Sequence, residues 1–91
     1  MSTVWVILGE EASIIGVINC ISKIKPFINA YVDMFYSAES AQKIKEQVKK
    51  AKFSTKDYKD QFFNGVIEWE FIHVSPQSMI TRADKIKGED L

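Results

Sequence analysis

The beginning of the chain consists of two short apolar runs separated by a polar interruption. Thr3–Leu8 (TVWVIL) and Ser13–Ile18 (SIIGVI) are rich in valine and isoleucine, and such β-branched residues favour extended backbone. Gly9–Ala12 lies between them and suits a turn. The pattern therefore predicts an antiparallel hairpin with a loop of about four residues. Gly16, inside the second run, indicates a bulge or a close backbone contact.

The middle of the chain has apolar residues at helical spacing. The first apolar stripe consists of Ile24, Phe27, Ile28, Tyr31, Val32 and Phe35. This stripe predicts a helix from Lys23 to Tyr36. Ser22 is the expected N-cap, and Pro26 falls in the first turn, where a missing N–H removes few helical hydrogen bonds.

A second, narrower apolar stripe follows a serine-containing break. It consists of Ala41, Ile44, Val48 and Ala51. The stripe predicts an amphipathic surface helix from Ala38 to Lys52, with Ser37 or Ser40 as the N-cap. Lysines dominate the end of this segment, which is the charge that the carboxyl end of a helix prefers.

The strongest local turn signal is Asn64-Gly65, because both residue types tolerate the positive φ of a two-residue type I′ hairpin. In the register that this turn implies, Phe62 pairs with Ile67. One face of the hairpin then collects Tyr58, Phe62, Ile67, Trp69 and Phe71, and the other collects Lys59, Gln61, Glu68 and Glu70. This separation favours the hairpin. The alternative is a short helix over Thr55–Phe63, with only Val66–Val74 extended.

The remaining segments complete a prediction for the whole fold. Ser75-Pro76 is expected to end the last strand, and Ser78 to cap a short terminal helix. That helix carries Met79, Ile80, Ala83 and Ile86. We expect one α+β domain over residues 1–91, with residues 88–91 frayed. Its antiparallel sheet is built from the N-terminal hairpin and an aromatic C-terminal strand or hairpin, and the two central amphipathic helices lie on one face.

Composition narrows the possible functions. No apolar run approaches the roughly 20 residues of a membrane helix, and the start lacks the features of a secretion signal, so we expect a cytoplasmic protein without a membrane partner. The net charge is zero, and no overall field attracts nucleic acid. Cys20 is the only cysteine, which excludes an internal disulfide and a cysteine-based metal cluster. The four glycines are scattered, and we expect no cofactor.

Residues for catalysis are sparse. His73 is the only histidine and shares a predicted strand face with Ser75. Neighbours at that spacing point in parallel and no third group orients the histidine, so a structural histidine with a satisfied ring nitrogen is the favoured interpretation. Cys20 precedes a helix start with lysines nearby, which can activate a thiol, but a small buried hydrophobic residue is favoured. We therefore expect a protein that is not an enzyme.

A lysine-rich stretch is the first candidate binding surface. Lys43–Asp60 contains seven lysines and three acidic residues. The candidate phosphate-binding residues are Lys43, Lys45, Lys49, Lys50 and Lys52. They support nucleic-acid or nucleotide-phosphate binding as the alternative function. The stretch has no arginine, the residue best shaped for phosphates and base edges, and a solvated helix face is the favoured interpretation.

The aromatic residues are the second candidate binding surface. Two Trp, three Tyr and six Phe are many for 91 residues, and a small domain has little interior in which to bury them. The candidate protein-binding residues are Trp5, Tyr58, Trp69 and Phe71. Exposed strand edges also favour a homodimer. A non-enzymatic protein-binding module is therefore the leading hypothesis.

The order of hairpin, amphipathic helices and an aromatic strand ending in IEWEFIHVSP resembles small accessory proteins of tailed bacteriophages. Those proteins often open with strands similar to VWVILGE and SIIGVIN, and the lysine-rich, arginine-poor composition is similar to that of AT-rich phage genomes. The resemblance spans Thr3–Ser75. It implies a phage-encoded inhibitor or modulator of a host protein, including a host defence protein, and implies no individual site residue.

Overall fold

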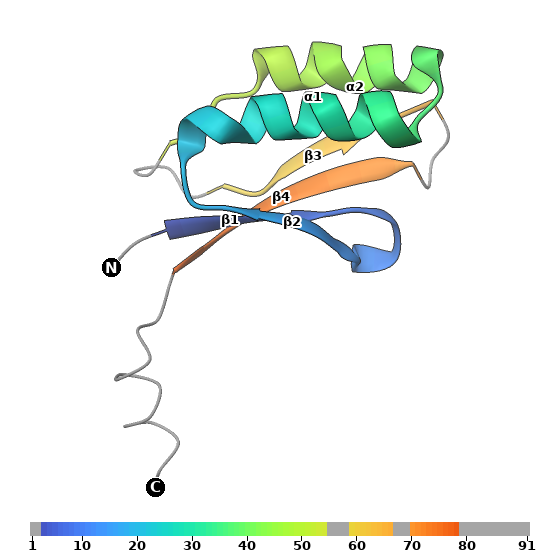
Figure 1. Ribbon diagram of the computed structural model, residues 1–91. Coiled ribbons are helices and arrows are strands. Elements are labelled where there is room, and N and C mark those ends of the chain that lie inside the picture. The colour runs from blue at the N-terminus through green and yellow to red at the C-terminus, as the bar shows by residue number, and fades with distance from the viewer. Residues whose placement is uncertain (1–2, 55–58, 67–69, 79–91) are drawn as a thin grey trace, which may run out of the picture.

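The computed structural model describes residues 3–54, 59–66 and 70–78. Four antiparallel strands form one sheet in the order β2-β1-β4-β3, and two helices cover one of its faces (Figure 1). The strands are β1 (Thr3–Leu8), β2 (Ile14–Ile18), β3 (Gln61–Asn64) and β4 (Phe71–Ser78). The helices are α1 (Ile24–Phe35) and α2 (Ala38–Lys50). The predicted α+β class, with both helices on one face, is confirmed.

Strands β1 and β2 form the predicted N-terminal hairpin. A single 3₁₀ turn, Glu10–Ala12, closes the loop, and the Gly9 N–H donates to the Ser13 carbonyl at 2.8 Å. The register passes from Ile7↔Gly16 to Leu8↔Ile14, so Ile15 is the extra residue of a bulge. A Cβ at position 16 would lie 2.4 Å from the ring of Phe27. Gly16 is therefore the point of close approach that the sequence indicated.

The two helices begin near their predicted positions. A 3₁₀ turn, Ile21–Lys23, precedes α1 and places Lys23 at the cap position with no side-chain cap. The prediction of Ser22 as N-cap is therefore wrong, since this additional turn moves the helix start past it. Of the two serines expected as possible caps of α2, Ser37 is the cap, its hydroxyl accepting from the Ser40 N–H at 3.2 Å.

Helix α2 ends at Lys50, two residues before the predicted Lys52. Ala51 has extended backbone, with a ψ of 147°. The change of direction brings Phe53 against the core, where its ring meets that of Trp5 edge-on at 5.8 Å. The packing of Phe53 thus gives a physical reason for the helix to end at this point. The apolar stripe of the helix does not reveal it.

The core lies between the helices and the inner face of the sheet. Its buried apolar residues are Trp5, Ile7, Ile24, Ile28, Val32, Ala41, Ile44, Val48, Phe63, Ile72 and Val74. Strands β1 and β4 contribute alternate residues, as expected when one face of a sheet is covered, and Ile15 and Ile18 of β2 pack partly buried against this core. The residues between them point to the opposite face, which carries no helix in the described part of the chain (Figure 1).

Strands β3 and β4 pair in a register different from the predicted one. Asn64 lies opposite Phe71, and Phe62 lies opposite His73. Residues 65–70 therefore connect the strands, and the Gly65 N–H donates to the Glu70 carbonyl at 2.7 Å. None of the described glycines has a positive φ, so the predicted type I′ turn at Asn64-Gly65 is wrong.

The packing of α2 and the core gives a physical reason for this register. The side-chain amide of Gln47 in α2 donates to the Asn64 carbonyl and accepts from the Asn64 N–H, which fixes Asn64 as the last residue of β3. The observed pairing also places Phe63 beside Ile72 in the core. The predicted register missed these contacts because neither is local in sequence.

Two further predictions for the C-terminal part are corrected. The strand conformation of Gln61–Asn64 excludes a helix that continues to Phe63; residues 55–58 lie outside the described part. Strand β4 does not end at Ser75-Pro76, since Pro76 pairs with Trp5 and the strand continues to Ser78. The ladder with β3 ends opposite Val74, so the missing N–H of Pro76 costs no bond to β3. The predicted terminal helix and frayed residues 88–91 lie outside the described residues.

Candidate protein-binding surface

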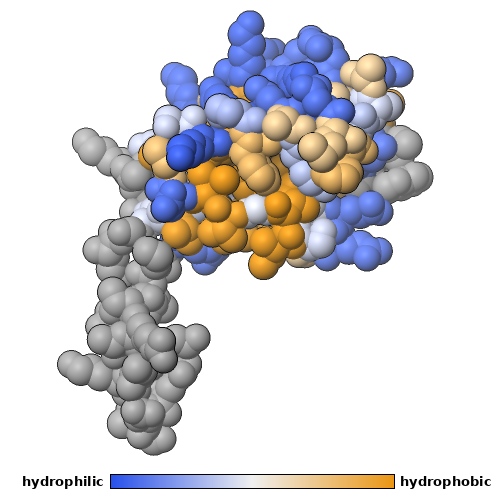
Figure 2. Space-filling model, in the orientation of Figure 1, coloured by the Kyte–Doolittle hydropathy of each residue, from blue (hydrophilic) through white to orange (hydrophobic). Residues whose placement is uncertain are grey.

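The face of the sheet opposite the helices carries apolar side chains from all four strands. The ladders group them in two sets, one on β1 and β2 and one on β3 and β4, with His73, Ser75 and Gln77 of β4 between the two sets. We call the apolar residues of both sets the open-face cluster: Val4, Val6, Leu8, Ile14, Val17, Phe62 and Phe71. Ile14, Val17 and Phe62 are 67%, 57% and 58% exposed. Figure 2 shows apolar side chains gathered below the helices, on the side where β1 and β2 lie.

The open-face cluster is free of formal charge within the strands. The other described side chains that share this face on β3 and β4 are Asn64, His73, Ser75 and Gln77. No lysine, arginine, aspartate or glutamate lies among them in the described strands. An apolar patch with an uncharged centre is typical of a protein interface rather than of a solvated sheet face.

Aromatic stacking organises one edge of this face. The ring of Phe62 stacks on the His73 imidazole, with centroids 4.3 Å apart and planes inclined by 15°, and it also contacts Phe71 at 5.6 Å. The His73 Nε2 lies 3.5 Å from an Asp60 carboxylate oxygen and has no hydrogen-bond partner among the residues that the structure describes. Nε2 is therefore not the ring nitrogen that is satisfied, because Phe62 covers the ring while Asp60 stays just beyond hydrogen-bonding distance.

The structure separates the aromatic candidates from one another. Trp5 is 1% exposed and belongs to the core, so it is not available for surface contact. Tyr58 and Trp69 lie outside the described residues. Phe71 lies on the open face and is half-buried. The exposed residues Ile14, Val17 and Phe62 were missed, although strict alternation with Trp5 and Ile7 across the first hairpin could have located the first two.

The lysine candidates do not converge on one point. Lys45 pairs with Asp33 of α1 at 2.5 Å, and Lys43, Lys49 and Lys50 are exposed along α2. Lys52 lines a separate hollow of about 550 Å³ at the end of the helices.

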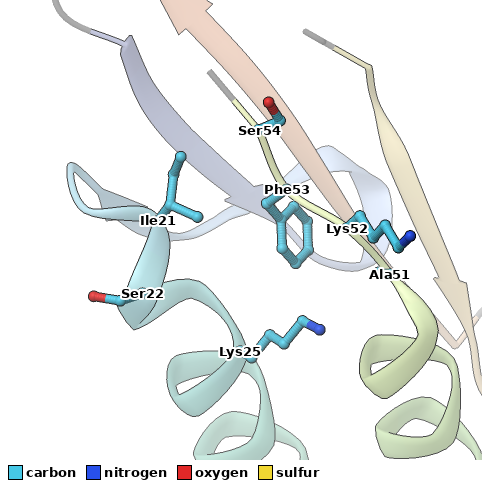
Figure 3. Close-up of a pocket in the computed structure, with 7 residues that line it drawn as sticks. All are labelled: Ile21, Ser22, Lys25, Ala51, Lys52, Phe53 and Ser54. Atoms are coloured by element: carbon cyan, nitrogen blue, oxygen red, sulfur yellow. The ribbon is translucent and has the colours of Figure 1, made fainter. Parts of the chain in front are cut away.

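Figure 3 shows that hollow, with Lys25 extending beneath the Phe53 ring and Lys52 on its far side. The Lys25 ammonium donates to the Lys49 carbonyl at 3.3 Å. The two lysines therefore line the hollow from different sides, and the Lys25 ammonium is already bonded to a main-chain carbonyl.

Cys20 is exposed, so the interpretation of a buried hydrophobic residue is wrong. Its thiol lies 3.1 Å from the Ser22 hydroxyl. Hydrogen bonds from the Ser22 side chain and backbone, with a smaller contribution from the charge of Lys23, lower the pKa of the Cys20 thiol. The chain turns into its 3₁₀ segment here, and this local geometry brings the donors to the sulfur.

We predict that Cys20 alkylates at lower pH than an ordinary thiol. Because its pKa is lowered, the reactive thiolate is present at lower pH, and the rate with iodoacetamide should reach half its maximum below the value of a free cysteine. Ser22→Ala should move that midpoint upward, while Ser13→Ala should leave it in place. A wild-type midpoint equal to that of free cysteine contradicts the prediction.

Three observations concern other classes of site. Among residues 3–54, 59–66 and 70–78, no group of three or more His, Cys, Asp or Glu side chains could hold a metal ion. No helix among these residues is long and apolar enough to cross a membrane. Comparison with protein families, with curated proteins and with solved structures finds no match to this chain.

Proposed function

We propose that this protein is a non-enzymatic protein-binding module whose partner packs on the open-face cluster. The observation that carries the proposal is the exposure of Ile14, Val17 and Phe62 on a sheet face whose strands carry no charged residue. Burial of apolar surface contributes roughly 25 cal/mol per Å², so a partner that covers these three side chains gains a large share of its binding free energy from them.

The chemistry of the surface defines the partner that would fit it. The aliphatic residues of the face lie on β1 and β2, and the Phe62–His73–Phe71 stack lies on β3 and β4. Aromatic side chains at interfaces commonly act as anchors that insert into a pocket of the partner. We therefore propose a partner with a flat or shallow apolar surface, and with a recess that accepts Phe62.

A narrower form of the proposal follows from the sequence alone. The resemblance to small accessory proteins of tailed bacteriophages supports a phage-encoded inhibitor or modulator of a host protein, including a host defence protein, acting in the host cytoplasm. This form rests on the strand patterns and the lysine-rich composition. It adds the partner's origin to the proposal and leaves the proposed contact surface unchanged.

The test compares three proteins as bait in the same affinity experiment. The wild type, the open-face variant Val17→Lys/Phe62→Lys and the control variant Lys49→Glu/Lys50→Glu are immobilised, and retained proteins are quantified by mass spectrometry. Both substituted pairs are exposed, so circular dichroism should show intact folds. We expect a retained protein whose recovery falls more than about tenfold, or about 1.4 kcal/mol, on the open-face variant and stays within about twofold on the control.

Other outcomes of the same experiment would overturn the proposal. Binding lost only on the control variant would point to the basic surface of α2. In that case the affinity of the wild-type protein for a labelled oligonucleotide should fall steeply with salt. If no retained protein depends on Val17 and Phe62 for its recovery, the open face is not the contact surface. Light scattering on the purified chain tests the expected homodimer. If the wild type is a dimer and Val17→Lys/Phe62→Lys is a monomer, the partner on the open face is a second copy of this chain.

A further inference from the structure

A second apolar surface lies on the helix side of β2, between that edge strand and α1. The groove has a volume of about 420 Å³. It is lined by Ile15, Phe27, Ala30, Tyr31, Met34 and Phe35. Met34 and Phe35 are 73% and 67% exposed, although both belong to the apolar side of the helix. In Figure 1, α1 runs above β2 along this side of the molecule.

The groove is built by the bulge in β2 and by an aromatic row on α1. The extra residue at the bulge, Ile15, faces the helix side, and Gly16 leaves room for the Phe27 ring beside it. Tyr31 stacks on Phe27 at 6.4 Å and contacts Phe35 at 4.8 Å. The strand therefore supplies one wall of the groove, and aromatic side chains spaced one helical turn apart supply the other.

The two edges of the sheet differ in how they are covered. At β3, Gln47 occupies both the N–H and the carbonyl of Asn64. At β2, β1 lies on one side and no described strand lies on the other. The sequence of β2, IIGVI, has neither a charged residue nor a proline, two of the features that commonly protect an edge from pairing, and carries a third, a bulge, only at Ile15. Strand β2 is therefore the edge better suited to accept another strand.

One end of the groove is acidic. Tyr31 and Phe35 also line an adjoining hollow whose acidic residues are Glu10, Glu11 and Glu70. Glu70 accepts a hydrogen bond from Ser40 at 2.8 Å, and no ion pair to any of the three carboxylates is formed among the described residues. Burial, followed by the neighbouring Tyr31 and the carboxylates of Glu70 and Glu10, raises the pKa of Tyr36 at this end. The end of the groove thus attracts positive charge.

We propose that the α1–β2 groove binds an extended segment of a partner protein, which adds to the sheet as a strand beside β2. Alternate apolar side chains of the segment enter the groove against Phe27, Tyr31 and Met34. A lysine or arginine of the segment lies beside Glu10 and Glu11. Main-chain hydrogen bonds supply affinity in this mode of recognition, and the pockets supply specificity. This groove faces the helix layer, so the inference goes beyond the proposed function of the open face.

The experiment selects ligands for the full-length protein from a random decapeptide library displayed on yeast. Affinities of the enriched peptides are measured by fluorescence anisotropy with fluorescein-labelled synthetic copies. The groove variant is Ala30→Lys/Met34→Lys, the acidic-end variant is Glu10→Gln/Glu11→Gln, and the control variant is Phe62→Lys on the open face. All five positions are exposed, and circular dichroism verifies that each variant is folded.

The expected result has three parts. Enriched peptides alternate apolar with other residues and carry Lys or Arg at one end. Their affinity falls about tenfold or more on the groove variant and severalfold on the acidic-end variant, and it stays within about twofold on Phe62→Lys. Methylation of one alternate set of peptide backbone nitrogens abolishes binding, while methylation of the other set is tolerated, because only every second N–H of a strand faces β2.

Each remaining outcome contradicts the inference. If the wild type enriches no peptides beyond those that the groove variant enriches, the groove does not bind extended peptides. Peptides that lose affinity on Phe62→Lys would belong to the open face and would support the proposed function alone. Peptides that bind the groove equally well with either set of nitrogens methylated, or without a basic residue, would exclude strand addition or the acidic end as the basis of recognition.

Discussion

Trp5→Ala should lower the free energy of unfolding by about 3–5 kcal/mol, the usual cost of removing a buried aromatic side chain. The indole is 1% exposed and meets the Phe53 ring edge-on. The substitution leaves a cavity at the centre of β1 that the flanking strands cannot close. Since small domains have a total stability of about 5–15 kcal/mol, the loss should be visible as a large drop in the midpoint of urea denaturation followed by circular dichroism.

Phe62→Ala is the matched control for this substitution. Phe62 is also an aromatic residue on a strand, but it is 58% exposed on the open face. Its removal should cost less than about 1 kcal/mol, because most of its surface is already in water. Equal losses in the two variants would contradict the assignment of Trp5 to the core and Phe62 to the surface.

Gly16→Val should destabilise the protein by about 1–3 kcal/mol, the usual cost of overpacking. The added Cβ would lie 2.4 Å from the far end of the Phe27 ring, well inside van der Waals contact. The ring must rotate away from β2, and the inner surface of the hairpin then loses its cover. Urea denaturation of the purified variant measures the effect.

A second variant tests whether Phe27 is the cause. In the background Phe27→Ala the space above Gly16 is empty, so Gly16→Val should cost less there than in the wild type. The difference between the two costs is the coupling free energy between the positions. A cost unchanged by Phe27→Ala would instead indicate that the effect of valine is on the bulge in the strand.

The elements that depend on nearby residues could be predicted from the sequence. Two runs rich in valine and isoleucine on either side of a short polar loop predicted the β1–β2 hairpin, and helical stripes predicted α1 and α2. Ser37 could be identified as a cap because its bond to Ser40 spans only three residues. Periodicity and caps report local geometry, and local geometry is what these elements require.

The C-terminal hairpin shows what tertiary structure decided. Asn64-Gly65 is a strong turn signal by itself, but Gln47 of α2 holds Asn64 at the end of the strand, and Phe63 packs in the core. The observed and predicted registers differ by an even number of residues, so Phe62 and Phe71 share a face in both. Phe63, Ile72 and Val74 decide which face of the hairpin meets the helices, because these three side chains are buried only when their face forms part of the inner surface of the sheet.

The candidate binding surface was decided in the same way. The sequence by itself showed that the chain has more aromatic residues than a small core needs, and it identified Phe71 among the candidates. Only the tertiary structure shows that Trp5 is buried with the Phe53 ring against it, and that Phe62 on β3 shares one uncovered face with Val17 and Ile14 on β2, at the opposite edge of the sheet. Exposure depends on which elements pack on a strand, and that information lies in contacts between distant residues rather than in any local pattern.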